Sequence, residues 1–266
     1  MVLSWDLETD SSIDLEEFIA FLDNLGDRVL IDQMDESALM LRKLYNNRDF
    51  LSRTLLKQLE NRLVFDSINP YTPQVFMLHR SENYFLRAAV WVPPAGRPGE
   101  EIFFYEDPHD HYFALLTLGY EGPGYETVIF EYDHEKVSGD VGEKVDVRFL
   151  TRVKLPRGRV LFYRDSRDIH VQLPSEDFSI SINVVVPKLQ MNRQYSFRME
   201  LHPSTKTALI KENLMFHKPT LVARFAHDVG VPEVANRLRS FVDDGDDCNA
   251  RRIAGELIRE IERVEV

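Results

Sequence analysis

The stretch DPHDHYFALLTLG, residues 107–119, carries the two features on which the fold and the function of this protein depend. Residues 111–119 form an apolar run with aromatic members that ends at a glycine, which is typical of a β-strand. His109 and His111 stand two positions apart at its start. Because residues i and i+2 of a strand point to the same face, both imidazoles are expected to face inward. The pair therefore predicts two ligands for one metal ion.

A third ligand is expected at His170. The preceding stretch, residues 155–169, has the pattern of a turn, a strand and a polar turn, and a further strand follows at residues 178–186. This order would bring one more imidazole to the same centre from a separate strand. The alternative stays open that residues 109–111 form a surface turn and that His170 is an ordinary core histidine.

The remaining five histidines are weaker candidates for metal ligation. They lie beside segments that look like turns, or in the C-terminal region that is predicted to be helical: His79, His134, His202, His217 and His227.

The centre of the chain is predicted to be a mainly β domain. Short runs rich in β-branched and aromatic residues alternate there with Gly, Pro and Asp turns, which indicates a sandwich or a barrel. The predicted strands are residues 84–92, 101–105, 111–119, 126–132, 145–155, 158–164 and 178–186.

Helical regions are predicted on both sides of a barrel that spans residues 67–203. In residues 1–66, Asp14 is the expected N-cap of a helix that stops at Gly26. Residues 204–266 repeat the apolar spacing of helices, with prolines near the expected starts and glycines near the ends. The apolar stripes of these helices are expected to cover the outside of the sheet, and the alternatives are a cap over the barrel mouth or a homodimer interface.

Composition limits the class of protein. The chain has 266 residues, 44% of them hydrophobic, and a net charge of −12, which disfavours nucleic-acid binding. We expect no membrane span and no secretory signal. The single cysteine, Cys248, rules out an intramolecular disulfide and a thiolate zinc cluster within one chain. A cytoplasmic location is the expectation that fits this cysteine usage.

Residues 71–188 resemble the cupin superfamily and, within it, the cysteine dioxygenase-like group of thiol dioxygenases. The likeness rests on His109-Asp110-His111, on ETVIF at residues 126–130, on Pro156 and Gly158 ahead of His170, and on SINVVVP at residues 181–187. It implies a jelly-roll barrel (a double-stranded β-helix) and one Fe(II) held by three histidines, with Ni, Cu and Zn as other candidates. Leu115 and Leu116 stand where many cupins carry a fourth ligand, a glutamate, which agrees with the three-histidine group.

The likeness does not extend to the residues that select the substrate in that group. The family's tyrosine near the metal falls at Val185, and its partner histidine falls at Asn183. The arginine that binds the substrate carboxylate falls near Pro73, with Arg80 or Arg87 as substitutes. We therefore expect a substrate other than free cysteine.

The predicted function is that of a mononuclear non-heme iron oxygenase, a metal-dependent enzyme that inserts oxygen from O₂ into a small amino-acid-like or thiol substrate. Tyr163, Asn183 and Arg87 are the predicted catalytic or substrate-contact residues, because they lie on strands that flank the ligands. One alternative is a non-catalytic cupin that binds a metal or a ligand. The other is a 2-oxoglutarate-dependent hydroxylase, which would need an acid at position 111 and a basic residue after His170, and residues 171–187 contain none.

Overall fold

The structure is a computed structural model, and it describes residues 3–60, 74–96, 105–187 and 193–214. Residues 1–213 form one compact unit and residues 214–266 form another. In the second unit the described positions are Leu214, which is not helical, and the helical residues Arg239, Ser240, Gly255 and Ile258. The remainder of the predicted C-terminal helices, and residues 101–104 of a predicted strand, lie outside the described residues.

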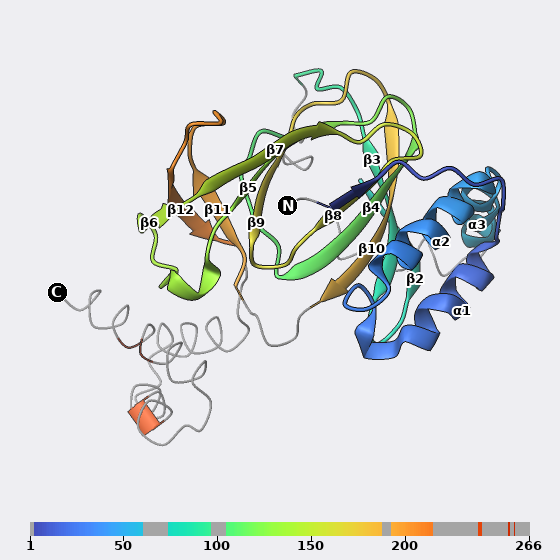
Figure 1. The fold of residues 1–266 in the computed structure, drawn as a ribbon, viewed down its shortest axis with the longest axis horizontal. Coiled ribbons are helices and arrows are strands. Elements are labelled where there is room, and N and C mark those ends of the chain that lie inside the picture. Colours follow the sequence, from blue (N-terminus) through green and yellow to red (C-terminus); the bar gives the residue numbers. More distant parts are fainter. Residues whose placement is uncertain are drawn as a thin grey trace. The chain divides into compact units, whose positions relative to one another are not determined.

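Two antiparallel sheets form the barrel (Figure 1). The first has the strand order β1 (Leu3–Trp5), β8 (Val160–Tyr163), β4 (Phe113–Glu121), β10 (Ser179–Pro187), β3 (Phe85–Trp91) and β2 (Val75–Arg80). The second has the order β7 (Arg148–Lys154), β5 (Glu126–Glu131) and β9 (Asp168–Gln172). Tyr105 and His109 extend the second sheet by bridging to the free side of β9.

This strand order is that of a jelly roll. The chain passes back and forth between the two sheets, so that β3, β10, β4 and β8 lie side by side while residues 105–109, β9, β5 and β7 face them. Two interlocked Greek keys produce this arrangement. The predicted mainly β jelly-roll fold is confirmed.

A third sheet packs on the outside of the second one. It consists of β11 (Tyr195–Arg198), β12 (Thr207–Asn213) and β6 (Lys144–Asp146), and its buried side chains join those of β5 and β9 in one apolar cluster. The prediction of a helical region from residue 204 is wrong for residues 207–213. Ala208 and Ile210 alternate there with exposed residues, which is the period of a half-buried strand.

The N-terminal region, which was predicted to be helical, contains three helices: α1 (Leu15–Leu25), α2 (Met34–Asn46) and α3 (Phe50–Glu60). Asp14 caps α1 through a reciprocal capping box with Glu17, and α1 ends at Gly26, whose φ is 59°. A short 3₁₀ turn, η1 (Gly26–Arg28), follows. The purely helical prediction is wrong at β1, which pairs with β8 and forms one edge of the first sheet. No helix in the described part of the chain is long and apolar enough to cross a membrane.

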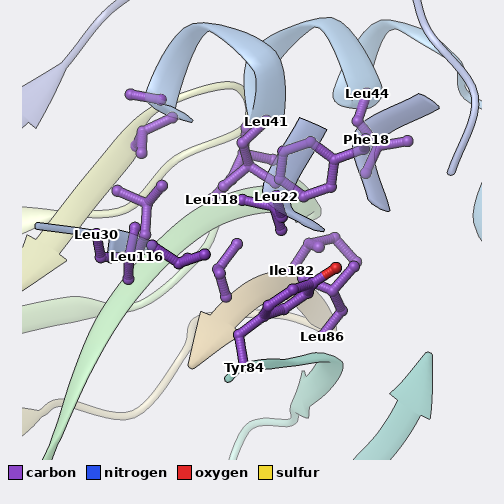
Figure 2. Close-up of a cluster of buried hydrophobic side chains, with 14 of the residues drawn as sticks. Phe18, Leu22, Leu30, Leu41, Leu44, Tyr84, Leu86, Leu116, Leu118 and Ile182 are labelled. Carbon is purple, nitrogen blue, oxygen red and sulfur yellow. The ribbon is translucent and has the colours of Figure 1, made fainter. Parts of the chain in front are cut away.

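The helices cover the outer face of the first sheet, as predicted from their apolar stripes (Figure 2). Helix side chains meet alternate side chains of the strands in a buried cluster that includes Phe18, Leu22, Leu41, Leu44, Leu86, Leu116, Leu118 and Ile182. Because successive strand residues point to opposite faces, the neighbours of these strand residues point into the barrel. Phe85, Leu115 and Val185 do so, in a separate interior cluster.

Candidate metal centre

Three imidazoles meet inside the barrel. His109 and His111 precede β4, and His170 lies in the middle of β9. Each offers one ring nitrogen, and these nitrogens all lie within 4.8 Å of one another. The side chains are 7%, 8% and 1% exposed, respectively, so the alternative of a surface turn at residues 109–111 is wrong.

Backbone pairing brings the third histidine to the first two. The N–H of His109 donates to the carbonyl of His170 (3.2 Å), and the N–H of His170 donates back to His109 (2.9 Å). β9 is in turn held by β5, where Ile129 lies opposite His170. The histidine predicted from a separate strand therefore reaches the same centre because its strand is the direct neighbour of residues 105–109.

Asp110 points away from the two histidines beside it, as the alternation predicts. Its buried carboxylate accepts hydrogen bonds from the backbone N–H of Tyr195 (2.6 Å) and from the hydroxyl of Tyr132 (2.6 Å). Burial raises the pKa of Asp110 to about 7, although both hydrogen bonds oppose the shift. These contacts attach the histidine stretch to the third sheet.

The electrostatics keep the three imidazoles neutral. Burial lowers the pKa of His109, and it lowers those of His111 and His170 well below the usual value. The charges of His170, His109 and Arg87 lower the pKa of His111 further. The charge of His109 does the same for His170. Neutral imidazole is the form that binds a metal.

Hydrogen bonds to the outer ring nitrogens orient two of the rings. Nδ1 of His109 lies 2.8 Å from the carbonyl oxygen of Asp107, which can only accept, so Nδ1 carries the proton and Nε2 carries the lone pair. Nδ1 of His170 lies 2.7 Å from the side-chain amide nitrogen of Gln172. The Nε2 atoms of His111 and His170 are 3.3 Å apart.

The donor set fits a divalent metal that prefers nitrogen. Three neutral imidazoles whose ring nitrogens converge suit Fe(II), Ni, Cu or Zn. Leu115 points into the barrel and Leu116 packs under the helices. Among the described residues no carboxylate joins the three histidines.

The predicted contact residues lie at different distances from the cluster. The Tyr163 ring is 4.7 Å from that of His170. Burial raises the Tyr163 pKa well above its usual value, and the hydroxyl lies beside those of Tyr125 and Thr127 without a well-formed hydrogen bond. Of the three predicted contact residues, Tyr163 is therefore the one whose ring packs directly on a clustered histidine, His170.

Arg87 and Asn183 lie farther away on the same interior face. The Arg87 guanidinium is 5.7 Å from the centre of the Phe113 ring, which stacks on His111 at 4.1 Å. Asn183 lies between Arg87 and Thr117 in the sheet, and Thr117 donates to its side-chain oxygen (2.6 Å). Arg80, the other candidate for a substrate arginine, is exposed at the end of β2.

The other three described histidines are not part of the three-histidine cluster. His79 is part of β2, His134 begins the 3₁₀ turn η3 (His134–Lys136), and His202 is exposed in a loop. His217 and His227 lie outside the described residues.

Two interior polar residues were missed by the sequence prediction, Gln172 and Tyr125. Gln172 is buried two positions after His170 and faces the same side of β9. The segment DIHVQ was interpreted as the end of a polar turn, so its alternation went unused. Had it been taken as a strand, the spacing of two would have placed Gln172 beside His170.

A surface pocket of about 630 Å³ lies apart from the three histidines. It is lined by residues of three segments: 131–135, 146–148 and 165–167. Its lining mixes acidic and basic side chains and contains none of the three clustered imidazoles.

No protein-family model and no curated protein matches the chain. Solved structures with a partial likeness include a DMSP lyase from Ruegeria pomeroyi DSS-3, with 11% identity and a TM-score of 0.27 over 44% of this chain and 48% of the lyase. A hydroquinone 1,2-dioxygenase from Sphingomonas sp. TTNP3 has 12% identity and a TM-score of 0.30 over 46% and 70% of the two chains. An 11S allergen from Cocos nucifera has 10% identity and a TM-score of 0.28 over 71% and 40%.

This chain thus spans about half the length of the lyase. At such identities and TM-scores the likenesses support no assignment of activity. The fold assignment follows from the strand order itself. That order defines a jelly-roll barrel, and three buried histidines meet inside it.

Proposed function

We propose that the protein is a mononuclear non-heme iron oxygenase of the three-histidine type, which inserts oxygen from O₂ into a small amino-acid-like or thiol substrate. The observation that carries the proposal is the convergence of three neutral, buried imidazoles within 4.8 Å. When bound there, Fe(II) would supply open coordination positions for substrate and O₂. Entry of both oxygen atoms into one substrate leaves no need for a separate reductant.

In this proposal the surrounding residues orient the substrate and exclude water. Phe113, stacked on His111, and Tyr163, packed on His170, shield the imidazoles on two sides. The Tyr163 hydroxyl stays protonated because burial raises its pKa, so it can donate a hydrogen bond. Arg87 supplies a positive charge near His111 that would attract an anionic group of the substrate.

The proposed substrate differs from free cysteine. The thiol dioxygenases place a tyrosine and a histidine where this chain has Val185 and Asn183. Val185 is fully buried in the interior apolar cluster and offers no polar group, and the Asn183 oxygen is already bonded to Thr117. Cytoplasmic location and a homodimer formed through the helical regions remain predictions.

The proposal is tested by purifying the protein anaerobically and measuring metal per chain for the wild type, His170→Ala and His202→Ala. His202 is exposed and outside the cluster, so His202→Ala is the matched control. We expect the wild type and the control to retain metal and His170→Ala to lose it. Equal metal content in all three proteins would contradict the metal site.

Oxygen uptake with a panel of thiols and amino acids then separates the enzyme from the non-catalytic alternative. Consumption of O₂ that depends on both substrate and His170 supports the oxygenase. Tight metal retention without oxygen consumption would instead identify a binding protein. Dependence on 2-oxoglutarate would identify the hydroxylase, although position 111 carries a histidine instead of the required acid.

A further inference from the structure

We infer that Gln172 is a positioning residue, which holds the ring of His170 in the one tautomer that can bind the metal. The inference rests on the proposed metal site. It concerns a residue that touches no reacting atom and acts through the ligand next to it.

Gln172 and His170 lie two residues apart on the inward face of β9. The Gln172 side-chain amide nitrogen is placed 2.7 Å from Nδ1 of His170, and Nε2 on the other side of the ring faces Nε2 of His111 at 3.3 Å. Gln172 thus contacts the ring edge that points away from the shared centre. Both side chains are buried, so water does not replace this contact.

The backbone on both sides holds Gln172 in place. Its carbonyl accepts the N–H of Glu106 (2.9 Å), and its Cα lies opposite Thr127 of β5. The amide therefore extends from a strand that is paired along both edges. A side chain anchored in this way can impose an orientation on the ring beside it.

The required tautomer follows from the chemistry of imidazole. A neutral imidazole carries one proton, so His170 can offer the Nε2 lone pair to a metal only if that proton is on Nδ1. A protonated Nδ1 needs an acceptor, whereas the atom placed 2.7 Å from it is the Gln172 amide nitrogen, which can only donate. The Gln172 amide oxygen is the group that can accept. The oxygen and nitrogen of an amide exchange places by a half-turn of the group, so Gln172 can present the oxygen.

The other half of the amide then faces Tyr125. The Gln172 side chain also forms a hydrogen bond with the Tyr125 side chain. With the oxygen toward His170, the NH₂ group would donate to the Tyr125 hydroxyl, so both ends of the amide would have a partner. At His109 the backbone carbonyl of Asp107 accepts the Nδ1 proton. At His170 the side chain of Gln172 would do the same.

The test is zinc binding to metal-stripped protein, measured by calorimetry for the wild type, Gln172→Met, Gln172→Glu and Gln74→Met. Methionine keeps the length of the side chain and removes the acceptor, whereas glutamate keeps an acceptor. Gln74 is also buried but lies at the start of β2, so Gln74→Met is the matched control for burying methionine. Urea unfolding of each metal-free protein verifies that it is folded.

We expect Gln172→Met to bind zinc about 10- to 100-fold more weakly than the wild type. Gln172→Glu and Gln74→Met should bind with affinities close to that of the wild type. The ¹⁵N spectrum of the zinc-loaded wild type should show the proton of His170 on Nδ1.

Three results would overturn the inference. Gln172→Met could bind as tightly as the wild type, glutamate could fail to rescue the loss, or the proton could be found on Nε2. Each would leave the metal site itself intact. If instead the wild type bound zinc no better than His170→Ala, the proposed function would fail and this inference with it.

Discussion

Individual titratable residues of the centre make stability depend on pH. A histidine with a lower pKa in the folded chain than in the unfolded chain binds its proton preferentially when unfolded. Its contribution to stability is therefore lost as the pH falls below the ordinary value of 6.5 toward the lowered one. Within that window each such group changes the free energy of unfolding by up to about 1.4 kcal/mol per pH unit. The three imidazoles act in the same direction.

Asp110 acts in the opposite direction. Its pKa is about 7 in the fold against 3.8 for the unperturbed group, so the folded state binds the proton more tightly and stability decreases as pH rises between these values. In EDTA-treated protein we expect the free energy of urea unfolding to decrease from about pH 7.5 to about pH 5.5. The decrease should be steeper in Asp110→Asn, which lacks the opposing group. A flat or inverted dependence in that variant would contradict the lowered histidine pKa values.

At the scale of elements, the connection between β4 and β5 depends on a close approach of two backbones. Gly124 lies in this connection with φ at +74°, and a Cβ there would lie 1.7 Å from the carbonyl oxygen of Leu155. Gly142 has a similar φ of +87° but open space around it. Alanine substitutions at Gly124 and Gly142 therefore distinguish the energetic cost of a left-handed backbone from the cost of a steric clash.

We expect Gly142→Ala to destabilise the protein by about 1–2 kcal/mol, which is the cost of placing an L-residue at positive φ. Gly124→Ala should cost about 1–3 kcal/mol more, because the backbones must separate as well. Chemical denaturation of both variants measures the difference. Equal destabilisation would mean that the β4–β5 connection at Gly124 does not contact the backbone at Leu155, which follows β7.

At the scale of the whole molecule, the first sheet has two faces with different tasks. Its outer face packs on the helices around the fully buried Leu22, while its inner face lines the barrel with a separate set of side chains. Stability and metal binding should therefore respond to different substitutions. Figure 1 shows the helices on one side of the barrel and the third sheet on the other.

Leu22→Ala tests this separation. Loss of the fully buried leucine should lower the free energy of unfolding by about 2–5 kcal/mol, through lost burial and a cavity under α1. The affinity of the folded protein for zinc should remain that of the wild type. A large loss of zinc affinity at a temperature where the variant is folded would show that the helices help to shape the centre.

Features set by neighbours in the chain could be predicted from the sequence alone. The capping of α1 by Asp14, the shared face of His109 and His111, and the opposite direction of Asp110 follow from helix and strand geometry over a few residues. The third histidine followed from the turn, strand and polar turn ahead of it, and the jelly-roll fold followed from the resemblance of whole motifs. The local features need no knowledge of distant contacts.

The tertiary structure decided what depends on pairing between distant segments. The sequence analysis did not identify β9 and β12 as strands, and in the structure they pair with β5 and β11. The same pairing places Gln172 behind His170 and Tyr163 against its ring. A side chain's neighbours across a sheet are set by register, and register depends on backbone hydrogen bonds between segments that local sequence patterns do not connect.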